Sequence, residues 1–387
     1  MDKTVITFTG DIGFDGYMKD RWRDASLLSG SVASFLQDST HVVANIEGPV
    51  YDGTVTGREN SVSALLHSID PGACTFLSAI GADIWNICNN HIMDAGPEGL
   101  ASTIEHAKKS AALTLGAGMD LGEASAPLIL PEAGGIGMIG VGYQRACRKA
   151  DVSTAGCFSW SDLDLIGQRI KEIKRSCRWC IVVAHAGEEF TALPSPYTRE
   201  RYLKYLDMGA DIVIAHHPHV VNNYELIGNK AIFYSLGNFI FDTDYQRSQM
   251  YTQYGVLLKI TFTEDGFTFL PMGIEVDRTA ETIKECSLPT IFADVPAEEY
   301  ELLKCLAAKV LIENTKRQLR YLRPADFSDA SEDDFRRNFY EPLRSGRVPG
   351  ETLDMQIIYP LSQKAADGKW SASRLHGIKD HMLSMIP

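Results

Sequence analysis

Carboxylate, amide and imidazole side chains recur in this sequence directly after short apolar runs. The groups, in chain order, are Gly10-Asp11, Asn45-Ile46-Glu47, Asn89-Asn90-His91 with Asp94 close behind, His185 with Glu189 close behind, and His216-His217-Pro218-His219. Neutral imidazoles combined with carboxylate and amide oxygens form sites for Mn, Fe, Zn or similar divalent ions, unlike the thiolate sites of structural zinc. Because these groups offer more than the four ligands that one ion usually takes, they predict two ions bridged by a carboxylate. Two such ions can convert water into a hydroxide that attacks phosphorus.

Each of these groups has a plain structural interpretation when it is taken alone. An Asp after a strand is often a helix cap, and Asn-Asn-His can be a turn whose side chains bond the backbone. A single His is more often packed or exposed than bound to a metal. Three imidazoles around Pro218 make poor core filler, however. The five groups together therefore favour a shared site.

The apolar runs before these groups have the length and composition of buried strands. Strands are expected at Val5–Thr9, Val42–Ile46, Ile84–Cys88, Cys180–Ala184 and Ile212–Ala215, and helices at Asp70–Ile80, Gly96–Ala111, Trp160–Ser176 and Arg199–Met208. Strands alternating with helices indicate an α/β fold with a central layered sheet. Because the carboxyl ends of strands in such folds share one edge, the polar groups are expected to converge there.

The pattern changes in the second half of the chain. Consecutive strands are expected at Val220–Leu226, Ala231–Ser235, Val256–Phe262 and Phe267–Met272, with Asp265-Gly266 as a hairpin turn. A long helix is then expected over Pro296–Tyr321, followed by a polar helical segment over Ser328–Leu343. The sequence thus predicts a domain over residues 1–284 that carries the site and a mainly helical C-terminal extension over residues 285–387.

Composition excludes several classes of function. The 387 residues carry a formal net charge of −13, which argues against a nucleic-acid-binding protein. No apolar run is long enough to span a bilayer, and the N-terminus lacks a signal-peptide pattern. The eight cysteines follow no disulfide-scaffold spacing and fit a reducing compartment. As written, the sequence predicts a cytoplasmic protein; an N-terminal anchor preceding it would instead place it on the extracellular face.

The ordered motifs resemble the CapA/PgsA family of capsule and poly-γ-glutamate synthesis, within the calcineurin-like metallophosphoesterase superfamily. The resemblance rests on the five polar groups above and on Tyr234–Asp242, and it covers roughly residues 4–277. It implies a layered β-sandwich flanked by helices, two divalent ions (Mn, Fe or Zn), and an anionic small-molecule or polymer substrate. The partners it implies are capsule-synthesis proteins.

The resemblance also assigns a role to each motif position. Its implied metal ligands are Asp11 and His219 for the first ion, Asn90, His185 and His217 for the second, and Glu47 as the bridge. His91 and Asp94 are the implied catalytic residues: His91 orients the phosphate or protonates the leaving oxygen, and Asp94, like Glu189 and Asn238, is a candidate to orient the imidazoles and the loop amides. The implied supporting residues are Asn45, His216, Glu189 and Asn238.

The sequence departs from the superfamily pattern in two places. The first motif normally continues Asp-x-His, whereas here Gly13 stands at the histidine position, and Glu47 replaces the usual bridging Asp. Three functions therefore stay open: a metal-dependent hydrolase of a phosphoester or related bond, a non-catalytic metal-binding accessory of capsule assembly that binds polymer or partner proteins, and a binding module that lost catalysis. The basic loop residues Arg58, Arg145, Arg148 and Lys149 could receive an anionic substrate or be solvated surface charges.

Overall fold

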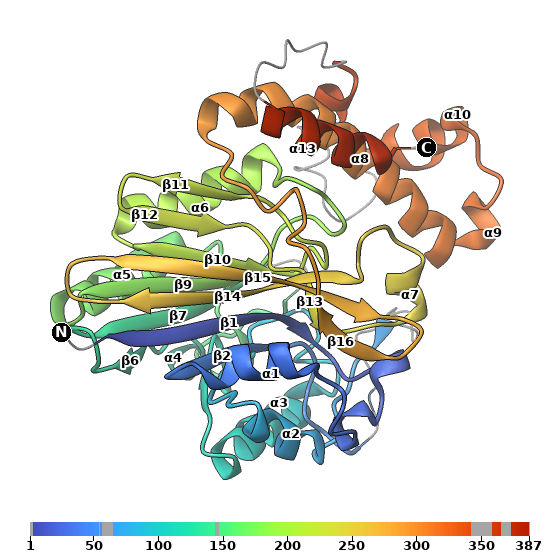
Figure 1. Cartoon of the computed structure of the whole chain (residues 1–387). Helices are drawn as coiled ribbons and strands as arrows, with labels where there is room; N and C mark the ends of the chain where they lie inside the picture. Colours follow the sequence, from blue (N-terminus) through green and yellow to red (C-terminus); the bar gives the residue numbers. More distant parts are fainter. Residues whose placement is uncertain are drawn as a thin grey trace.

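The computed structural model describes residues 3–53, 55, 65–143, 147–341, 358–364 and 373–386. Two β-sheets lie at its centre (Figure 1). The eight-stranded sheet contains, in spatial order, β16 (Thr282–Glu285), β15 (Phe267–Asp277), β14 (Tyr254–Phe262), β1 (Thr4–Ile12), β2 (His41–Ile46), β3 (Ile84–Asn86) and β4 (Leu113–Leu115), with β13 (Asn238–Ile240) paired to β1. The six-stranded sheet contains β11 (Tyr224–Ile227), β12 (Lys230–Phe233), β10 (Ile212–His216), β9 (Trp179–His185), β7 (Ile136–Gly142) and β6 (Leu128–Leu130).

Helices cover the outer faces of both sheets. The remaining elements are the 3-10 helices η1 (Gly16–Met18) and η2 (Arg21–Arg23), α1 (Gly30–Gln37), α2 (Ala73–Ala79), α3 (Gly96–Lys109), α4 (Leu121–Ala124), α5 (Leu163–Ser176), α6 (Pro196–Met208), α7 (Asp244–Arg247), α8 (Ala297–Leu322), α9 (Pro324–Phe327), α10 (Glu332–Phe335), the π-helix η4 (Arg336–Tyr340), α13 (Ser373–Ser384) and the short pair β5 (Ala117–Gly118) and β8 (Gly156–Cys157). Helices α1 to α3 lie on one side of the molecule, and α8 and α13 lie at the opposite end (Figure 1). The expected α/β class, a β-sandwich flanked by helices with further helices at the C-terminus, is confirmed.

Alternate side chains along each central strand enter different cores. In β9, Ile181 and Val183 belong to the core between the sheets, whereas Val182 packs with the helices α5 and α6. In β1, Ile6 and Phe8 likewise belong to the core between the sheets. Because both faces of β9 are buried, its sequence is a continuous apolar run, whereas β1 alternates Ile6 and Phe8 with the buried Thr7 and Thr9.

The two sheets form the layered β-sandwich that the family resemblance implies. Strand β7 is one of the elements that the sequence pattern does not predict, because glycines interrupt its apolar residues. The others include β4, β6, β13, β16 and α1. Those glycines allow close packing: a Cβ on Gly137 would lie 2.3 Å from Ile173, and one on Gly140 would lie 2.7 Å from Asn86. The glycines therefore mark close approach of a strand to its neighbours, not a loop.

Several predicted boundaries also shift. The helix expected from Trp160 begins at Leu163, and the strand expected over Val220–Leu226 is Tyr224–Ile227. The helix expected over Ser328–Leu343 is divided into α10 and the π-helix η4, and its last residues lie outside the described residues. The long helix expected over Pro296–Tyr321 is α8, within one residue at each end.

The C-terminal helices α8 and α13 close one end of the core between the sheets. Leu303 and Val310 of α8, and Ile378 of α13, belong to the same hydrophobic cluster as Ile181 and Phe233 of the six-stranded sheet. A domain boundary at residue 284 stays a prediction, and the helices beyond it share this core. No helix in the described part of the chain combines the length and apolar character needed to cross a bilayer.

Candidate metal centre

The predicted strand ends meet at one edge of the sandwich. Asp11 at the end of β1 is in parallel register with Asn45 of β2, and His185 of β9 is in register with His216 of β10. These pairs belong to different sheets, and Asn45 Nδ2 lies 3.3 Å from His185 Nδ1 across the sandwich. The expectation that polar groups converge at the carboxyl ends of the strands is confirmed.

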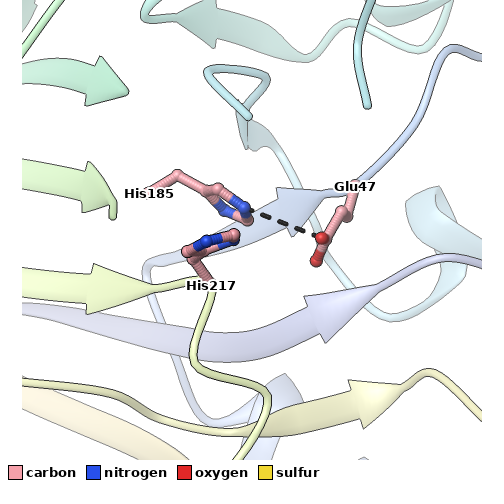
Figure 2. Close-up of side chains that lie close together, drawn as sticks. All are labelled: Glu47, His185 and His217. Atoms are coloured by element: carbon pink, nitrogen blue, oxygen red, sulfur yellow. Dashed lines mark ion pairs between the residues drawn. The ribbon is translucent and has the colours of Figure 1, made fainter. Parts of the chain in front are cut away.

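Asp11 and Glu47 form the acidic part of the site, and both are fully buried. Asn45 Nδ2 donates a hydrogen bond to Asp11 Oδ1 at 2.8 Å, and Asn86 in turn donates to Asn45 Oδ1 at 2.7 Å. Glu47 Oε1 lies 3.6 Å from His185 Nε2 and 3.4 Å from His219 Nε2. The carboxylates of the eight-stranded sheet thus face the imidazoles of the six-stranded sheet, as Figure 2 shows for Glu47, His185 and His217.

The imidazoles come from the end of β9 and from the turn after β10. His185 Nε2 lies 2.8 Å from Asn90 Oδ1. After β10, His217 and His219 adopt positive φ angles of 96° and 56°, which non-glycine residues rarely take and which cost on the order of 1 kcal/mol or more each. His219 Nδ1 lies 3.2 Å from Asp11 Oδ2 and 3.0 Å from Asn238 Oδ1, so Asn238 holds the ring of His219.

The site contains several buried polar atoms without a hydrogen-bond partner. They are Asp11 Oδ2, both carboxylate oxygens of Glu47, His216 Nδ1 and His217 Nδ1. A buried unpaired polar atom is costly, and a divalent cation would satisfy this set of oxygens and nitrogens. The sets Asp11–Glu47–His219, Glu47–His185–His217 and Glu189–His217–His219 each bring three donor atoms within 4.8 Å of one another. The residues present therefore fit divalent ions.

The pKa values of the site's carboxylates and imidazoles are shifted by burial and by neighbouring titratable groups. Burial, then the neighbouring imidazoles, lowers the pKa of His185 well below its ordinary value, and burial also lowers that of His217. These rings are neutral, the form that binds metal ions. Burial raises the pKa of Glu47 well above its usual range. Burial opposes ionisation of Asp11, but contacts with His216 and His219 outweigh it and lower its pKa.

His91 lies beside the predicted metal ligands and is held by Asp94. His91 Nδ1 lies 2.8 Å from Asp94 Oδ2, and this contact fixes the orientation of the ring. Nε2 is then the ring nitrogen that can gain or lose a proton. Burial, then the nearby His67, lowers the pKa of His91 well below its ordinary value. The lowered pKa favours the neutral form of the His91 ring even beside Asp94.

Sequence reasoning missed His67 and Asp15. The rings of His67 and His91 meet edge to face with centroids 4.0 Å apart, and His67 Nδ1 lies 2.6 Å from Asp15 Oδ2. The backbone N–H of His67 donates to Asp94 Oδ2 at 3.0 Å. His67 follows no recognisable strand in the sequence, so nothing local marked it.

Glycines explain two features of the first motif. A Cβ on Gly10 would lie 2.2 Å from the carbonyl oxygen of Gly237, because β1 and β13 approach closely there. A Cβ on Gly13 would lie 2.5 Å from the ring of Phe241. Phe241 therefore occupies the space into which the superfamily's histidine at position 13 would project.

The predicted supporting residues differ in their surroundings. Asn45 and Asn238 contact predicted ligands directly, and His216 Nδ1 lies 3.3 Å from Asp11 Oδ1. Glu189 belongs to one of the potential ligand sets, and its Oε2 accepts hydrogen bonds from Tyr245 and Gln318. Among the basic loop residues, Lys149 faces Asp162 at 3.8 Å, and Arg58 and Arg145 lie outside the described residues.

Comparison with known proteins identifies the family. The model of the family described as "Bacterial capsule synthesis protein PGA_cap" matches residues 5–243. The chain belongs to this family. The resemblance that the motifs indicate is thereby confirmed.

Two curated relatives are similar to this chain over 64% of its length. The PGA biosynthesis protein CapA of Bacillus subtilis is 28% identical over 254 residues, 64% of this chain and 66% of that protein. The capsule biosynthesis protein CapA of Bacillus anthracis is 27% identical over 256 residues, 64% of this chain and 62% of that protein. The chain therefore spans just under two thirds of these relatives.

Solved structures give weaker similarity. A hypothetical protein from Thermus thermophilus aligns with a TM-score of 0.45 and 14% identity over 70% of this chain and 99% of its own. The purple acid phosphatase PPD1 from yellow lupin seeds aligns with a TM-score of 0.32 and 9% identity over 76% of this chain and 54% of its own.

Proposed function

We propose that this capsule-synthesis family member is a metal-dependent hydrolase that cleaves a phosphoester or a related bond in a precursor of a cell-envelope polymer. The observation that carries the proposal is the group of buried donor atoms on Glu47 and His217 that have no hydrogen-bond partner, within reach of the Asp11 carboxylate and His219. Carboxylates and imidazoles without partners are costly inside a protein unless a cation binds them. Two divalent ions would also make this site electropositive despite the net charge of −13, so that an anionic substrate could enter.

The proposed ligand set follows the two sheets. Asp11, Glu47 and Asn90 would supply oxygens, and His185, His217 and His219 would supply nitrogens. Glu189, which is grouped with His217 and His219, is a further candidate ligand. Bound divalent ions would supply a nucleophilic hydroxide at neutral pH and stabilise charge on the phosphoryl oxygens.

The other residues would position groups and move a proton. Asp94 holds the ring of His91 through Nδ1. An arriving phosphoryl group is negative and raises the pKa of the nearby imidazole, so His91 would gain a proton as substrate binds. Nε2 of His91 could then donate that proton to the leaving oxygen. Asn45 and Asn238 would orient Asp11 and His219.

A phosphatase assay with matched variants tests this proposal. Purified protein supplied with Mn²⁺ should hydrolyse 4-nitrophenyl phosphate, and Asp11→Ala should abolish both the bound Mn²⁺ and the turnover. Asp211→Ala is the control, because Asp211 is a buried carboxylate at the opposite end of β10, paired with Lys174 at 2.8 Å. A protein that binds no Mn²⁺, or whose turnover survives Asp11→Ala, would refute the proposal.

One observation favours a second candidate function. Phe241 occupies the position next to Gly13 where the superfamily's imidazole would project, so the first ion would lack one ligand. A site with fewer ligands could serve structure in a non-catalytic accessory that binds polymer or partner proteins during capsule assembly. Stoichiometric Mn²⁺ binding without turnover of any phosphoester would favour this alternative.

A further inference from the structure

Helix α8 faces the candidate metal centre across a pocket. The pocket has a volume of about 290 Å³, and Asn90, Glu189 and His217 line it on the side of the metal centre. Gln318 and neighbouring side chains line it on the side of α8. The family match ends at residue 243, whereas α8 begins at Ala297. The helix that faces the centre therefore belongs to a part of the chain that the family model does not cover.

Two side chains one turn apart on α8 bond two consecutive residues of the loop after β9. Gln318 Nε2 donates a hydrogen bond to Glu189 Oε2 at 2.9 Å, and the side-chain amide of Asn314 donates to the backbone carbonyl oxygen of Phe190. Asn314 is buried. Because a buried amide is costly unless it is hydrogen-bonded, an Asn at this position indicates a specific contact with the loop. Helix α8 thus fixes the carboxylate of Glu189 and the backbone of Phe190 separately.

Phe190 connects this contact to the turn that carries His217 and His219. Its backbone N–H donates to the carbonyl oxygen of Pro218 at 2.8 Å, and its ring stacks on that of His219 with centroids 6.0 Å apart. Phe190 has a φ of 58°, and His217 and His219 also have positive φ angles. Non-glycine residues keep such conformations only where surrounding contacts hold them. The hydrogen bond from Asn314 is one of the contacts that hold this strained group.

The far end of the loop is anchored independently of Asn314. The backbone N–H of Ser195 donates to Glu188 Oε2 at 3.0 Å, and the hydroxyl of Thr198 donates to Glu188 Oε1 at 2.8 Å. The hydroxyl of Tyr300, near the start of α8, donates to the carbonyl oxygen of Pro194 at 2.9 Å. We therefore expect the loss of Asn314 to disturb residues 189 and 190 while the rest of the loop stays folded.

We propose that α8 is part of the metal centre, and that Asn314 is a positioning residue which, through Phe190, sets the ring of His219 and the turn that carries His217. This inference rests on the proposed metal-dependent function, because His217 and His219 are proposed ligands. It assigns α8 a role in metal affinity in addition to its packing against the core between the sheets. A helix that only covered this core would contribute stability and leave metal affinity unchanged.

Titration calorimetry with Mn²⁺ on the full chain tests this role without requiring turnover. We expect Asn314→Ala to weaken Mn²⁺ binding by the folded protein about tenfold or more, as loss of a group that orients metal ligands does. Tyr300→Phe is the matched control, because it also removes one hydrogen bond from α8 to a backbone carbonyl of this loop. Pro194 belongs to none of the potential ligand sets found among the described residues. Tyr300→Phe should therefore unfold at a lower temperature but bind Mn²⁺ like the wild type.

A second variant tests the connection through Phe190. Phe190→Leu keeps the backbone hydrogen bonds and removes the ring stacked on His219, so Mn²⁺ binding should weaken at least about threefold. Because Asn314 acts through Phe190, the double variant should lose less affinity than the product of the two single losses.

The outcomes separate this inference from the proposed hydrolysis. Wild-type Mn²⁺ affinity in folded Asn314→Ala would overturn the inference, and so would equal losses in Asn314→Ala and Tyr300→Phe. If Asn314→Ala failed to fold, wild-type affinity in Phe190→Leu would overturn it. A wild-type protein that bound no Mn²⁺ would refute both proposals. Weakened Mn²⁺ binding in Asn314→Ala, without phosphoester turnover by the wild type, would support the role of α8 and refute the hydrolase.

Discussion

The two sheets contribute different chemistry to their shared edge. The eight-stranded sheet and the loops after its strands supply oxygen donors, on Asp11, Glu47 and Asn90, whereas the six-stranded sheet supplies the imidazoles of His185, His217 and His219. Neither sheet alone contains a complete ligand set for two ions. The proposed ligands therefore come together only when the two sheets pack against each other. We expect metal binding to depend on the folded tertiary structure for this reason.

The largest effects should follow the loss of one proposed ligand from either sheet. We expect Glu47→Ala and His217→Ala each to weaken Mn²⁺ binding by at least about 100-fold, more than the loss of a supporting residue does, and to reduce hydrolysis to background. Mn²⁺ content by atomic emission and turnover of 4-nitrophenyl phosphate provide the measurements. His41→Ala, at the opposite end of β2, is the control. If only His217→Ala lost metal, Glu47 would not be a ligand.

Replacing His91 should separate chemistry from metal binding. His91→Gln should lower kcat by a factor of about 10² to 10⁴, typical for loss of a general acid, and should leave the Mn²⁺ content unchanged. His41 lies 2.7 Å from Asp83 and so provides a matched His–Asp pair far from the site, where His41→Gln should have little effect. Loss of bound Mn²⁺ in His91→Gln would assign His91 a ligand role.

A smaller effect should reveal whether α8 takes part in the metal centre. Gln318→Ala removes one of two hydrogen bonds to Glu189 Oε2 and should weaken Mn²⁺ binding about tenfold, as loss of a group that orients a ligand does. Isothermal titration with Mn²⁺ measures the change. Lys309→Ala, an exposed position on the same helix, should bind Mn²⁺ like the wild type. Equal affinities for all three proteins would leave Glu189 outside the ligand set.

The smallest effect should be a pH dependence of Mn²⁺ affinity. Burial raises the pKa of Glu47, so its carboxyl group retains a proton that metal binding must displace. Affinity should therefore increase between about pH 6 and about pH 8, with release on the order of one proton per protein. Titrations in buffers of different ionisation enthalpy measure the released protons. Affinity that is constant or falls over this range would show that Glu47 is not a ligand.

Local sequence features predicted a large part of this architecture. Polar residues directly after buried apolar runs located the ends of β1, β2, β9 and β10, and the spacing of Leu303 and Val310 located α8. Each of these features depends only on a few residues that are neighbours in the sequence. They can therefore be recognised without knowledge of the tertiary structure. Strand β7 escaped because its glycines, which permit close packing against Ile173 and Asn86, have the composition of a loop.

The sequence by itself determined the kinds of donor, their order along the chain, and the family to which the chain belongs. Tertiary structure decided which sheet carries each donor, brought His67 against His91, set the ring of Phe241 beside Gly13, and positioned α8 over the pocket. The physical reason is one of distance along the chain. Strand ends are marked by adjacent residues, whereas contacts such as Gln318 with Glu189 depend on how segments far apart in the sequence pack together.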